Sequence, residues 1–227
     1  MIVISEELIR LNGICRDYYT RGTVVHALKG IDLSIEKGDF ISIIGRSGSG
    51  KSTLMNILGC LDRQTKGEYY LEGMDISTLS DRKLSFLRSR IISFVFQSFN
   101  LISSLNSEEN VSLPLMYKGI PKKERQTAAC RALEMVGMSE RRLYYPRELS
   151  GGQQQRVAVA RAIASEPEIL LADEPTGSLD SESGEKVLSV MEEMNRSGVT
   201  VIMITHDNRL SERAKRCIRI VNGQIMP

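Results

Sequence analysis

Residues 45–52 read Gly45-Arg46-Ser47-Gly48-Ser49-Gly50-Lys51-Ser52. They fit the pattern G-x-x-x-x-G-K-[ST], in which glycines turn backbone N–H groups towards a phosphate, a lysine adds positive charge and a hydroxyl is placed for Mg²⁺. The apolar run 40–44 before them is typical of a buried parallel strand, and 51–58 after them has the spacing of a helix. The start of a helix favours an anion. The sequence therefore predicts nucleotide phosphates at this loop.

Composition narrows the class of protein. The chain has 227 residues, of which 41% are hydrophobic and 26% charged, as is typical of a soluble globular protein with a substantial core. A net charge of +2 from 30 basic and 28 acidic residues gives no field that would favour nucleic acid. Its 4 cysteines form no C-x-x-C pair and it has only 2 histidines, so a zinc site is not expected.

The same features predict a cytoplasmic protein. Scattered cysteines and an N-terminus without a secretory leader indicate a reducing compartment. No apolar run approaches the roughly 20 residues that cross a bilayer. If the protein works at a membrane, we expect another chain to supply the spanning part.

The N-terminal third is expected to add a small antiparallel sheet beside the nucleotide core. Residues 8–15 and 31–36 alternate apolar and polar side chains, and 67–73 is a short strand pattern between glycines. Residues 17–22, with two tyrosines, are predicted to form a loop. Adenine would lie beside this sheet.

The pattern of apolar and polar residues changes after Gln97. Residues 81–90 have a helical pattern and 91–96 are a buried-type strand that ends at Gln97. From there the chain favours helix, and Pro121 suits a first helical turn. We therefore expect an α/β protein in which 1–97 and 148–227 form the core with its antiparallel β-subdomain, and 98–147 form an inserted α-helical subdomain. No further domain is expected after residue 227.

The expected exit from the helical insertion is Leu149-Ser150-Gly151-Gly152-Gln153. Ser150 and Gln153 have the spacing of a capping box, which is a purely structural explanation. That explanation does not account for Gly151 and Gly152, because each glycine in a first helical turn costs roughly 1 kcal/mol against alanine. Glycines that leave N–H groups bare suit the close approach of an anion.

Two later strands end in polar side chains. The strand 168–174 ends in Asp173 and Glu174, with Pro175 marking its end, and the strand 199–205 is followed by His206. Ligands of open α/β sheets bind at the carboxyl ends of the strands. A solvated strand end and a structural histidine are the alternatives. Residues 217–226 are predicted to form a hairpin around Asn222-Gly223.

In this order, the motifs resemble those of the ATP-binding subunit of ABC transporters over essentially the whole chain. They are Walker A (45–52), the glutamine loop (Gln97), the LSGGQ signature (149–153), Walker B (Asp173, Glu174), the D-loop (178–180) and the switch histidine (His206). The stretches 52–62, 110–115, 149–156 and 172–177 look like the MacB and lipoprotein-release branch. Arg46 and Ser178 depart from it, since the branch more often has a small residue or proline and an alanine or asparagine there.

The resemblance implies a P-loop NTPase core of the ABC ATPase fold, with ATP and Mg²⁺ as cofactors. It implies that Tyr18, rather than Tyr19, stacks on adenine, that Lys51 holds the β- and γ-phosphates, and that Glu174 polarises the attacking water with help from His206 and Gln97. Mg²⁺ would be held by Ser52, Gln97 and, through water, Asp173. The nucleotide-binding set implied is Tyr18, Gly45, Ser47, Gly48, Ser49, Gly50, Lys51, Ser52, Thr53, Gln97, Ser150, Gly151, Gly152, Gln153, Asp173, Glu174, Asp180 and His206.

The implied partners are a second copy of the chain, whose signature residues act on the ATP of the first, and a four-helix permease of the MacB and FtsX type. The chain would lie on the inner face of the membrane and power export of a peptide, macrolide, antimicrobial or lipoprotein, with a periplasmic or extracellular adaptor reached through the permease. An FtsE-like cell-division ATPase that regulates a wall hydrolase, and an amino-acid importer ATPase, are the alternatives. DNA-repair and ribosome-binding relatives are disfavoured by the single compact cassette and the lack of a basic stripe.

Overall fold

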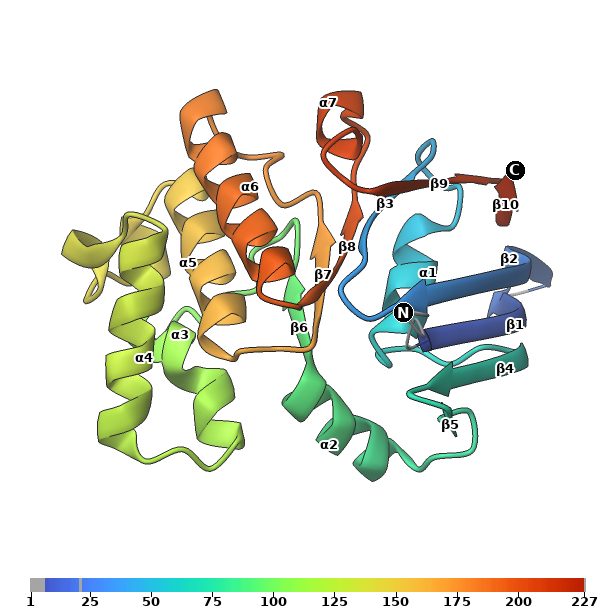
Figure 1. Ribbon diagram of the computed structural model, residues 1–227, viewed down its shortest axis with the longest axis horizontal. Helices are drawn as coiled ribbons and strands as arrows, with labels where there is room; N and C mark the ends of the chain where they lie inside the picture. The colour runs from blue at the N-terminus through green and yellow to red at the C-terminus, as the bar shows by residue number, and fades with distance from the viewer. Residues whose placement is uncertain (1–6, 21, 227) are drawn as a thin grey trace, which may run out of the picture. The chain divides into compact units, whose positions relative to one another are not determined.

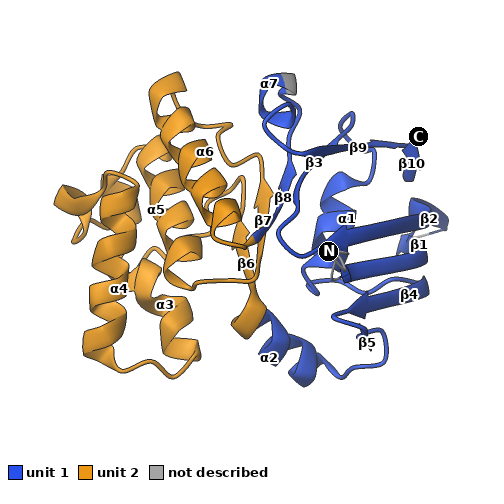
Figure 2. Cartoon of the chain, viewed as in Figure 1, with its two compact units in different colours: residues 1–88, 200–227 blue, residues 89–199 orange. Residues whose placement is uncertain are grey.

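The computed structural model describes residues 7–20 and 22–226 (Figure 1). The backbone packs into two compact units: unit 1 comprises residues 1–88 and 200–227, and unit 2 comprises 89–199 (Figure 2). The expectations about an N-terminal leader and about residue 21 of the predicted loop fall outside the described residues. Within the described ranges, no helix is both long and apolar enough to cross a bilayer.

Unit 1 contains the expected antiparallel sheet. Its strands are β1 (Glu7–Thr20), β2 (Thr23–Glu36), β4 (Lys66–Leu71) and β5 (Met74–Asp75), in the order β2-β1-β4-β5. Their apolar residues are buried on one face; Leu8, Ile14 and Ile31 are examples.

One local prediction for this sheet was wrong. Residues 17–20 are not in a loop: they continue β1, and Tyr18 pairs with Val25 of β2. The register of β1 against β2 shifts between Leu11 and Asp17, so the alternation of side chains is interrupted there. A break of this kind ends the period-2 pattern without ending the strand.

Unit 1 also contains a mostly parallel set of strands. β3 (Phe40–Ile44) pairs in parallel with β8 (Thr200–Ile204) and β9 (Arg216–Val221), and β10 (Gln224–Met226) returns antiparallel to β9. The β9–β10 hairpin turns at 222–223, as predicted. β3 and β8 are almost wholly buried, which explains why they lack alternation.

The helices of unit 1 are short. α1 (Lys51–Leu58) follows the phosphate loop with the predicted bounds and buries Leu54, Ile57 and Leu58. α7 (Asn208–Ser211) follows β8, and α2 (Asp81–Ile91) leads along the chain into unit 2.

Unit 2 pairs β6 (Ile92–Val95) in parallel with β7 (Ile169–Asp173). Its helices are α3 (Ser107–Tyr117), α4 (Lys122–Met135), α5 (Gly151–Ala164) and α6 (Ser181–Arg196), with short 3₁₀ turns at Ser139–Arg141 and Pro146–Glu148. α3 and α4 pack against each other and against α5 (Figure 1). The predicted helical segment 98–147 therefore lies inside unit 2, and its standing as a separate subdomain stays a prediction.

Candidate functional site

The phosphate loop of unit 1 lines a cavity of about 710 Å³. The buried strand β3 delivers the chain to the loop, and α1 begins at Lys51 directly after it. The remaining walls are His206, which follows β8, and the end of β9 with its turn. The structure thus brings two predicted site segments together: the loop and His206. The full lining is Ile44, Gly45, Arg46, Ser47, Gly48, Ser49, His206, Arg219, Ile220, Val221 and Asn222.

Two of the loop glycines are required by close backbone packing. A Cβ on Gly45 would lie 2.3 Å from the carbonyl oxygen of Ile220. Gly50 has φ of +107°, and a Cβ there would lie 2.6 Å from the carbonyl oxygen of Ala27. Only glycine permits both the left-handed backbone and the contact at position 50.

The loop presents hydrogen-bond donors that suit an anion. Within residues 7–20 and 22–226, the N–H groups of Gly48, Gly50 and Ser52 donate to no acceptor. Ser49 Oγ is buried and has no hydrogen-bond partner in the described chain. Donors aligned at a helix N-terminus, together with a buried hydroxyl, fit the phosphates of a nucleotide.

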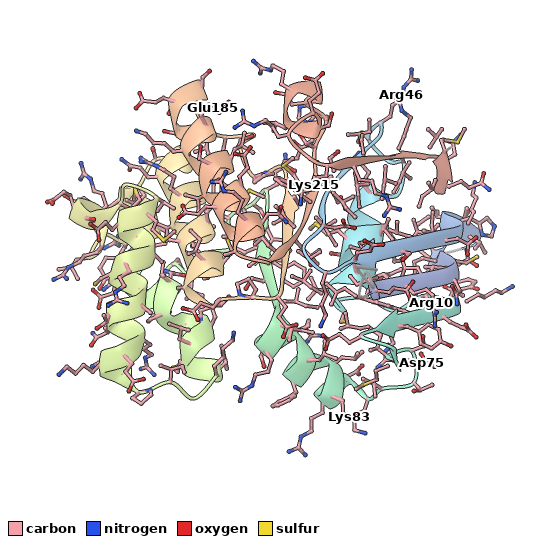
Figure 3. All side chains as sticks on the ribbon, viewed as in Figure 1. Arg10, Arg46, Asp75, Lys83, Glu185 and Lys215 are labelled. Atoms are coloured by element: carbon pink, nitrogen blue, oxygen red, sulfur yellow. The ribbon has the colours of Figure 1, made fainter. Side chains whose placement is uncertain are left out.

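Lys51 lies over this loop. Its Nζ donates to the carbonyl oxygens of Gly45 at 2.8 Å and Arg46 at 3.0 Å. An ammonium group has three N–H donors, so one remains for a phosphate. The Arg46 side chain, which departs from the branch pattern, is exposed and extends away from the ribbon (Figure 3).

The phosphate loop is also held by backbone hydrogen bonds of Gly223, which the sequence did not reveal. The Gly223 N–H donates to the Ser49 carbonyl oxygen at 2.9 Å, and the Gly223 carbonyl oxygen accepts from the Lys29 N–H at 2.8 Å. The turn between β9 and β10 therefore joins the loop to β2. The Asn222-Gly223 pair was the available signal, but it indicated only a hairpin.

Tyr18 lies on β1 in the same unit. Its hydroxyl donates to Asp62 Oδ2 at 2.8 Å, and the guanidinium of Arg16 lies over its ring, 4.6 Å from the centroid. Tyr19 is 73% exposed. Of the two tyrosines considered for adenine, Tyr18 is the one that has a fixed position.

Gln97 lies in unit 2, just after β6, and is exposed. The next residues are strained: Phe99 has φ of +60° and Asn100 has φ of +49°. Arg161 of α5 holds both, since its guanidinium donates to the Phe99 carbonyl at 2.8 Å and the Asn100 carbonyl at 2.6 Å. Burial lowers the pKa of Arg161. Sequence reasoning missed Arg161, which looks locally like any polar residue on a helix.

Asp173 and Glu174, which are adjacent in sequence, differ in backbone conformation. β7 ends at Asp173, and Glu174 has φ of +47°, so the chain turns immediately after the strand. Gln155 of α5 donates to the Pro175 carbonyl at 3.0 Å and holds this turn. The strand therefore ends one residue before the predicted end at Glu174, and a left-handed glutamate is the kind of strained residue that clusters at functional sites.

The signature residues form the start of α5. The capping box is present: the Gln153 N–H donates to Ser150 Oγ at 3.3 Å, and the Ser150 N–H donates to Gln153 Oε1 at 3.0 Å. Within the described chain the N–H groups of Gly151 and Gly152 have no acceptor. The structural explanation therefore holds for the side chains, while two bare amides remain for an anion.

Asp180 caps α6 in the same unit. Its Oδ1 accepts from the Ser183 N–H at 2.9 Å, and this backbone hydrogen bond, together with that of the Ser183 side chain, lowers the pKa of the carboxyl group. Its predicted contact with nucleotide stays a prediction.

A metal would have to be bound by residues from different segments. The predicted Mg²⁺ ligands come from the start of α1 (Ser52), the segment after β6 (Gln97) and the end of β7 (Asp173), and they are an all-oxygen set of the kind Mg²⁺ prefers. Across the described ranges no group of three or more His, Cys, Asp or Glu side chains is placed to hold a metal ion.

Known proteins are similar in sequence to this chain over nearly its full length. Residues 28–177 match the ABC transporter family. The chain is 48% identical over 220 residues to the uncharacterized ABC transporter ATP-binding protein YknY of Bacillus subtilis, covering 97% of this chain and 96% of YknY. It is 50% identical over 219 residues to the macrolide export ATP-binding/permease protein MacB of Brucella melitensis, covering 96% of this chain and 34% of MacB.

A third relative is the pyoverdine export ATP-binding/permease protein PvdT of Pseudomonas aeruginosa, 49% identical over 220 residues, with 96% of this chain and 33% of PvdT covered. The chain thus spans about a third of the length of MacB and PvdT. Among solved structures, the dimeric post-hydrolysis state of the ATP-binding cassette MJ0796, bound to ADP and Pi, matches with a TM-score of 0.94 and 41% identity over 97% of each chain.

The family match, the shared cassette fold and the phosphate loop with its bare amides lead to one assignment: the chain belongs to the ABC transporter family, as an ATP-binding and ATP-hydrolysing cassette of the ABC ATPase fold.

Proposed function

We propose that this ATPase powers a MacB-type membrane permease for export. The observation that carries the proposal is the cavity at the phosphate loop, in a chain that is 50% identical to a macrolide exporter and 49% identical to a pyoverdine exporter. The cargo would be recognised by the permease, which would also hold the cassette at the inner face of the membrane.

The phosphates of ATP would be held by residues of unit 1. The bare loop amides, the remaining N–H of Lys51 and the buried hydroxyl of Ser49 supply the donors. Ser52, Gln97 and Asp173 would hold Mg²⁺, which neutralises charge on the β- and γ-phosphates when bound.

Glu174 would orient and polarise the attacking water. It directly follows the last residue of β7, and its left-handed backbone turns it out of the strand's alternation. His206 lines the phosphate cavity, where it would contact the γ-phosphate. Phosphoryl transfer depends mainly on positioning and on charge stabilisation, which these groups supply.

A second copy would complete each site. The bare amides of Gly151 and Gly152 at the start of α5 suit a phosphate, and we propose that they receive the γ-phosphate held by the partner's loop. The dimeric form of MJ0796 supports this arrangement. ATP would hold two chains together, and loss of the γ-phosphate after hydrolysis would release them, which is the mechanical step.

The permease would dock on unit 2. A cavity of about 290 Å³ there is lined largely by apolar side chains, among them Phe94, Phe96 and the 71% exposed Tyr117. Asn100 and Arg161 are also in its wall, so a helix of the permease in this cavity would touch the segment that follows Gln97. The docking region proposed is therefore the segment from Gln97 to Leu105 with this cavity.

The test is to purify the chain with the membrane protein that accompanies it and to reconstitute both in vesicles. We expect ATP-dependent movement of solute across the membrane, absent with Glu174→Gln. If the pair instead activates a cell-wall hydrolase and moves no solute, the cell-division alternative replaces export. Dependence on an external binding protein would indicate an importer.

A further inference from the structure

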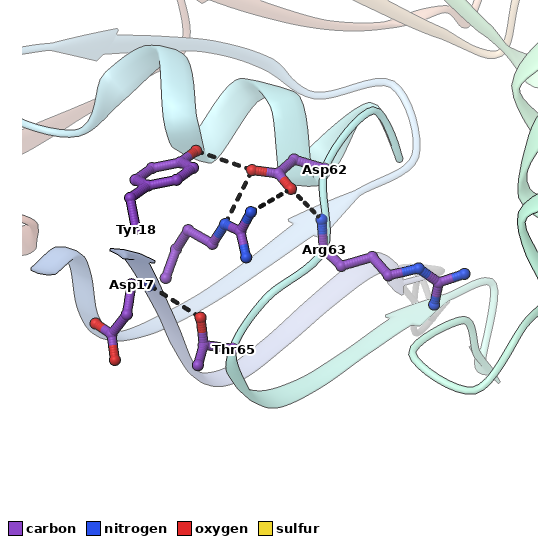
Figure 4. A network of polar contacts seen from close by, with 6 residues as sticks. Asp17, Tyr18, Asp62, Arg63 and Thr65 are labelled. Atoms are coloured by element: carbon purple, nitrogen blue, oxygen red, sulfur yellow. Dashed lines mark hydrogen bonds and ion pairs between the residues drawn. The ribbon is translucent and has the colours of Figure 1, made fainter. Parts of the chain in front are cut away.

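The ring of Tyr18 is fixed by a cluster of charged side chains (Figure 4). The carboxylate of Asp62 accepts from the Tyr18 hydroxyl at 2.8 Å and from Arg16 through two hydrogen bonds of 2.9 and 2.8 Å. The Arg16 guanidinium covers one face of the Tyr18 ring at 4.6 Å. Burial alone would lower the pKa of Arg16, but hydrogen bonding to Tyr18 and the charge of Asp62 outweigh it and raise that pKa.

Asp62 itself is fixed to the end of helix α1. Its backbone N–H donates to the Asn56 carbonyl at 3.1 Å, and the Leu61 N–H donates to the same oxygen at 2.8 Å. The Arg63 N–H then donates to Asp62 Oδ1 at 2.8 Å. Asp62 is about three-quarters buried, since its side chain has a relative exposure of 24%.

Helix α1 begins at the phosphate loop, so the loop and Tyr18 are attached to opposite ends of one short helix. The helix has 8 residues and is about 12 Å long at 1.5 Å per residue. A short helix with one face buried in the core is stiff, and it therefore sets the separation between the proposed phosphate donors and the tyrosine ring.

The Tyr18 side chain is not wholly buried. Tyr18 is partly exposed, and its cross-strand neighbour Val25 is 50% exposed. Arg16 occupies one face, so a base would stack on the other. The fixed hydroxyl of Tyr18 prevents the ring from rotating away from that position.

We infer that Asp62, with Arg16, is a positioning residue for the base of the nucleotide: it attaches the Tyr18 ring to the end of α1, at a set separation from the phosphate loop. The inference rests on the proposed stacking of Tyr18 on adenine. A mobile ring must be ordered when the base binds, whereas a fixed ring is already in place. Ordering a side chain costs about 0.5–1.5 kcal/mol, which corresponds to roughly a 2- to 13-fold change in affinity.

The experiment compares the binding of ATP with that of inorganic tripolyphosphate, which has no base, by calorimetry of the full chain in EDTA. We expect Asp62→Ala and Tyr18→Phe to weaken ATP roughly 3- to 10-fold and to leave tripolyphosphate within about 2-fold, because only the base contact loses its order. Asp62→Asn keeps an acceptor for the hydroxyl and should recover part of the loss.

The chain offers a matched control on the same sheet. Arg10 lies over the ring of Tyr70 at 4.7 Å, and the Tyr70 hydroxyl donates to Glu68 at 3.2 Å. Glu68→Ala removes this similar acceptor without touching Tyr18 and should change neither affinity. Lys51→Ala is the reference for the phosphate site and should weaken both ligands.

The inference is overturned if Asp62→Ala binds ATP as tightly as wild type. It is also overturned if Asp62→Ala weakens ATP and tripolyphosphate by the same factor, which would indicate general damage to α1. Failure of the proposed export function is distinguishable, since it would show in the vesicle experiment while the wild-type protein still bound ATP and tripolyphosphate. If Tyr18→Ala leaves ATP binding intact, the stacking contact itself is wrong.

Discussion

At the scale of single residues, Glu174 is proposed to serve nucleotide hydrolysis rather than to hold the nucleotide. It stands one residue beyond β7 with a left-handed backbone, while the proposed phosphate donors belong to residues 45–52. Glu174→Gln removes the basic group and keeps the size of the side chain. We expect turnover to fall by on the order of 10² to 10⁴ and ATP affinity to stay unchanged, because only general-base help is lost.

The measurement is steady-state phosphate release, with calorimetric titration of ATP on the same preparations. Glu182→Gln is the control for carboxylate removal, since Glu182 is an exposed residue in the first turn of α6 that pairs with Lys186, and its loss should leave turnover unchanged. Wild-type turnover by Glu174→Gln would assign the base to another residue.

A second residue-scale prediction concerns Cys60. Burial raises the pKa of its thiol from the ordinary 9.0 to about 11. Below pH 9 the thiol is protonated in both the folded and unfolded states, so its titration does not change the stability of the fold. Between pH 9 and 11 only the unfolded chain loses the proton, and the stability of the fold should therefore fall as pH rises, by up to about 1.4 kcal/mol per unit.

Guanidinium unfolding midpoints between pH 8 and 11 test this, with Cys60→Ala as the matched variant. The stability gap between the two proteins should change in favour of Cys60→Ala as the pH rises. A gap that stays constant across this range would show that Cys60 titrates normally. Tyr69, whose pKa is raised chiefly by burial and further by Cys60, is present in both proteins, so the effect of burial on its titration cancels.

At the scale of elements, the β9–β10 turn is predicted to support nucleotide binding. Gly223 has φ of +81°, and a Cβ there would lie 2.6 Å from the Ala27 carbonyl oxygen. Gly223→Ala should push the turn off the loop and break the hydrogen bond to Ser49. We expect lower ATP affinity and a lower melting temperature.

Gly73→Ala separates this clash from backbone strain alone. Gly73 has φ of +75°, but nothing lies within 4 Å of the position of its Cβ. The Gly73→Ala variant should lose only the roughly 1–2 kcal/mol of folding stability that a left-handed alanine costs, and it should bind ATP normally. Equal ATP affinity in both variants would show that the β9–β10 turn does not support ATP binding.

The helices and strands show which features of the fold local sequence patterns can predict and which they cannot. The strand-loop-helix unit from Phe40 to Leu58 was predicted to the residue, because a buried strand, a glycine loop and a helix start each have a local signal. β1 was ended too early, because its register shifts hide the rest of the strand. Arg161, Asp62 and Gly223 were missed, since each acts through a contact far along the chain, which no local pattern reports.

At the scale of the whole molecule, the proposed sites need two copies. The loop amides at Gly48 and Gly50 and the helix-start amides at Gly151 and Gly152 have no acceptor in the described chain, and each group is proposed to bind phosphate. If each ATP takes one group from each copy, hydrolysis requires pairing. The rate per chain should therefore fall on dilution, because dimers dissociate.

Mixing two inactive variants distinguishes shared sites from a dimer that merely stabilises its subunits. Lys51→Ala damages the loop, while Gly151→Asp places a carboxylate at the start of α5, where it suits the helix dipole but repels phosphate. Position 151 is exposed and its Cβ would lie 3.7 Å from Phe99, so the fold should tolerate the change.

In a mixed dimer one site has both defects and the other has none. Random pairing makes half the dimers mixed, so activity should return to about a quarter of wild type. A mixture as inactive as its components would mean that each chain hydrolyses ATP with its own signature, or that one intact site cannot act alone, and either result contradicts this prediction.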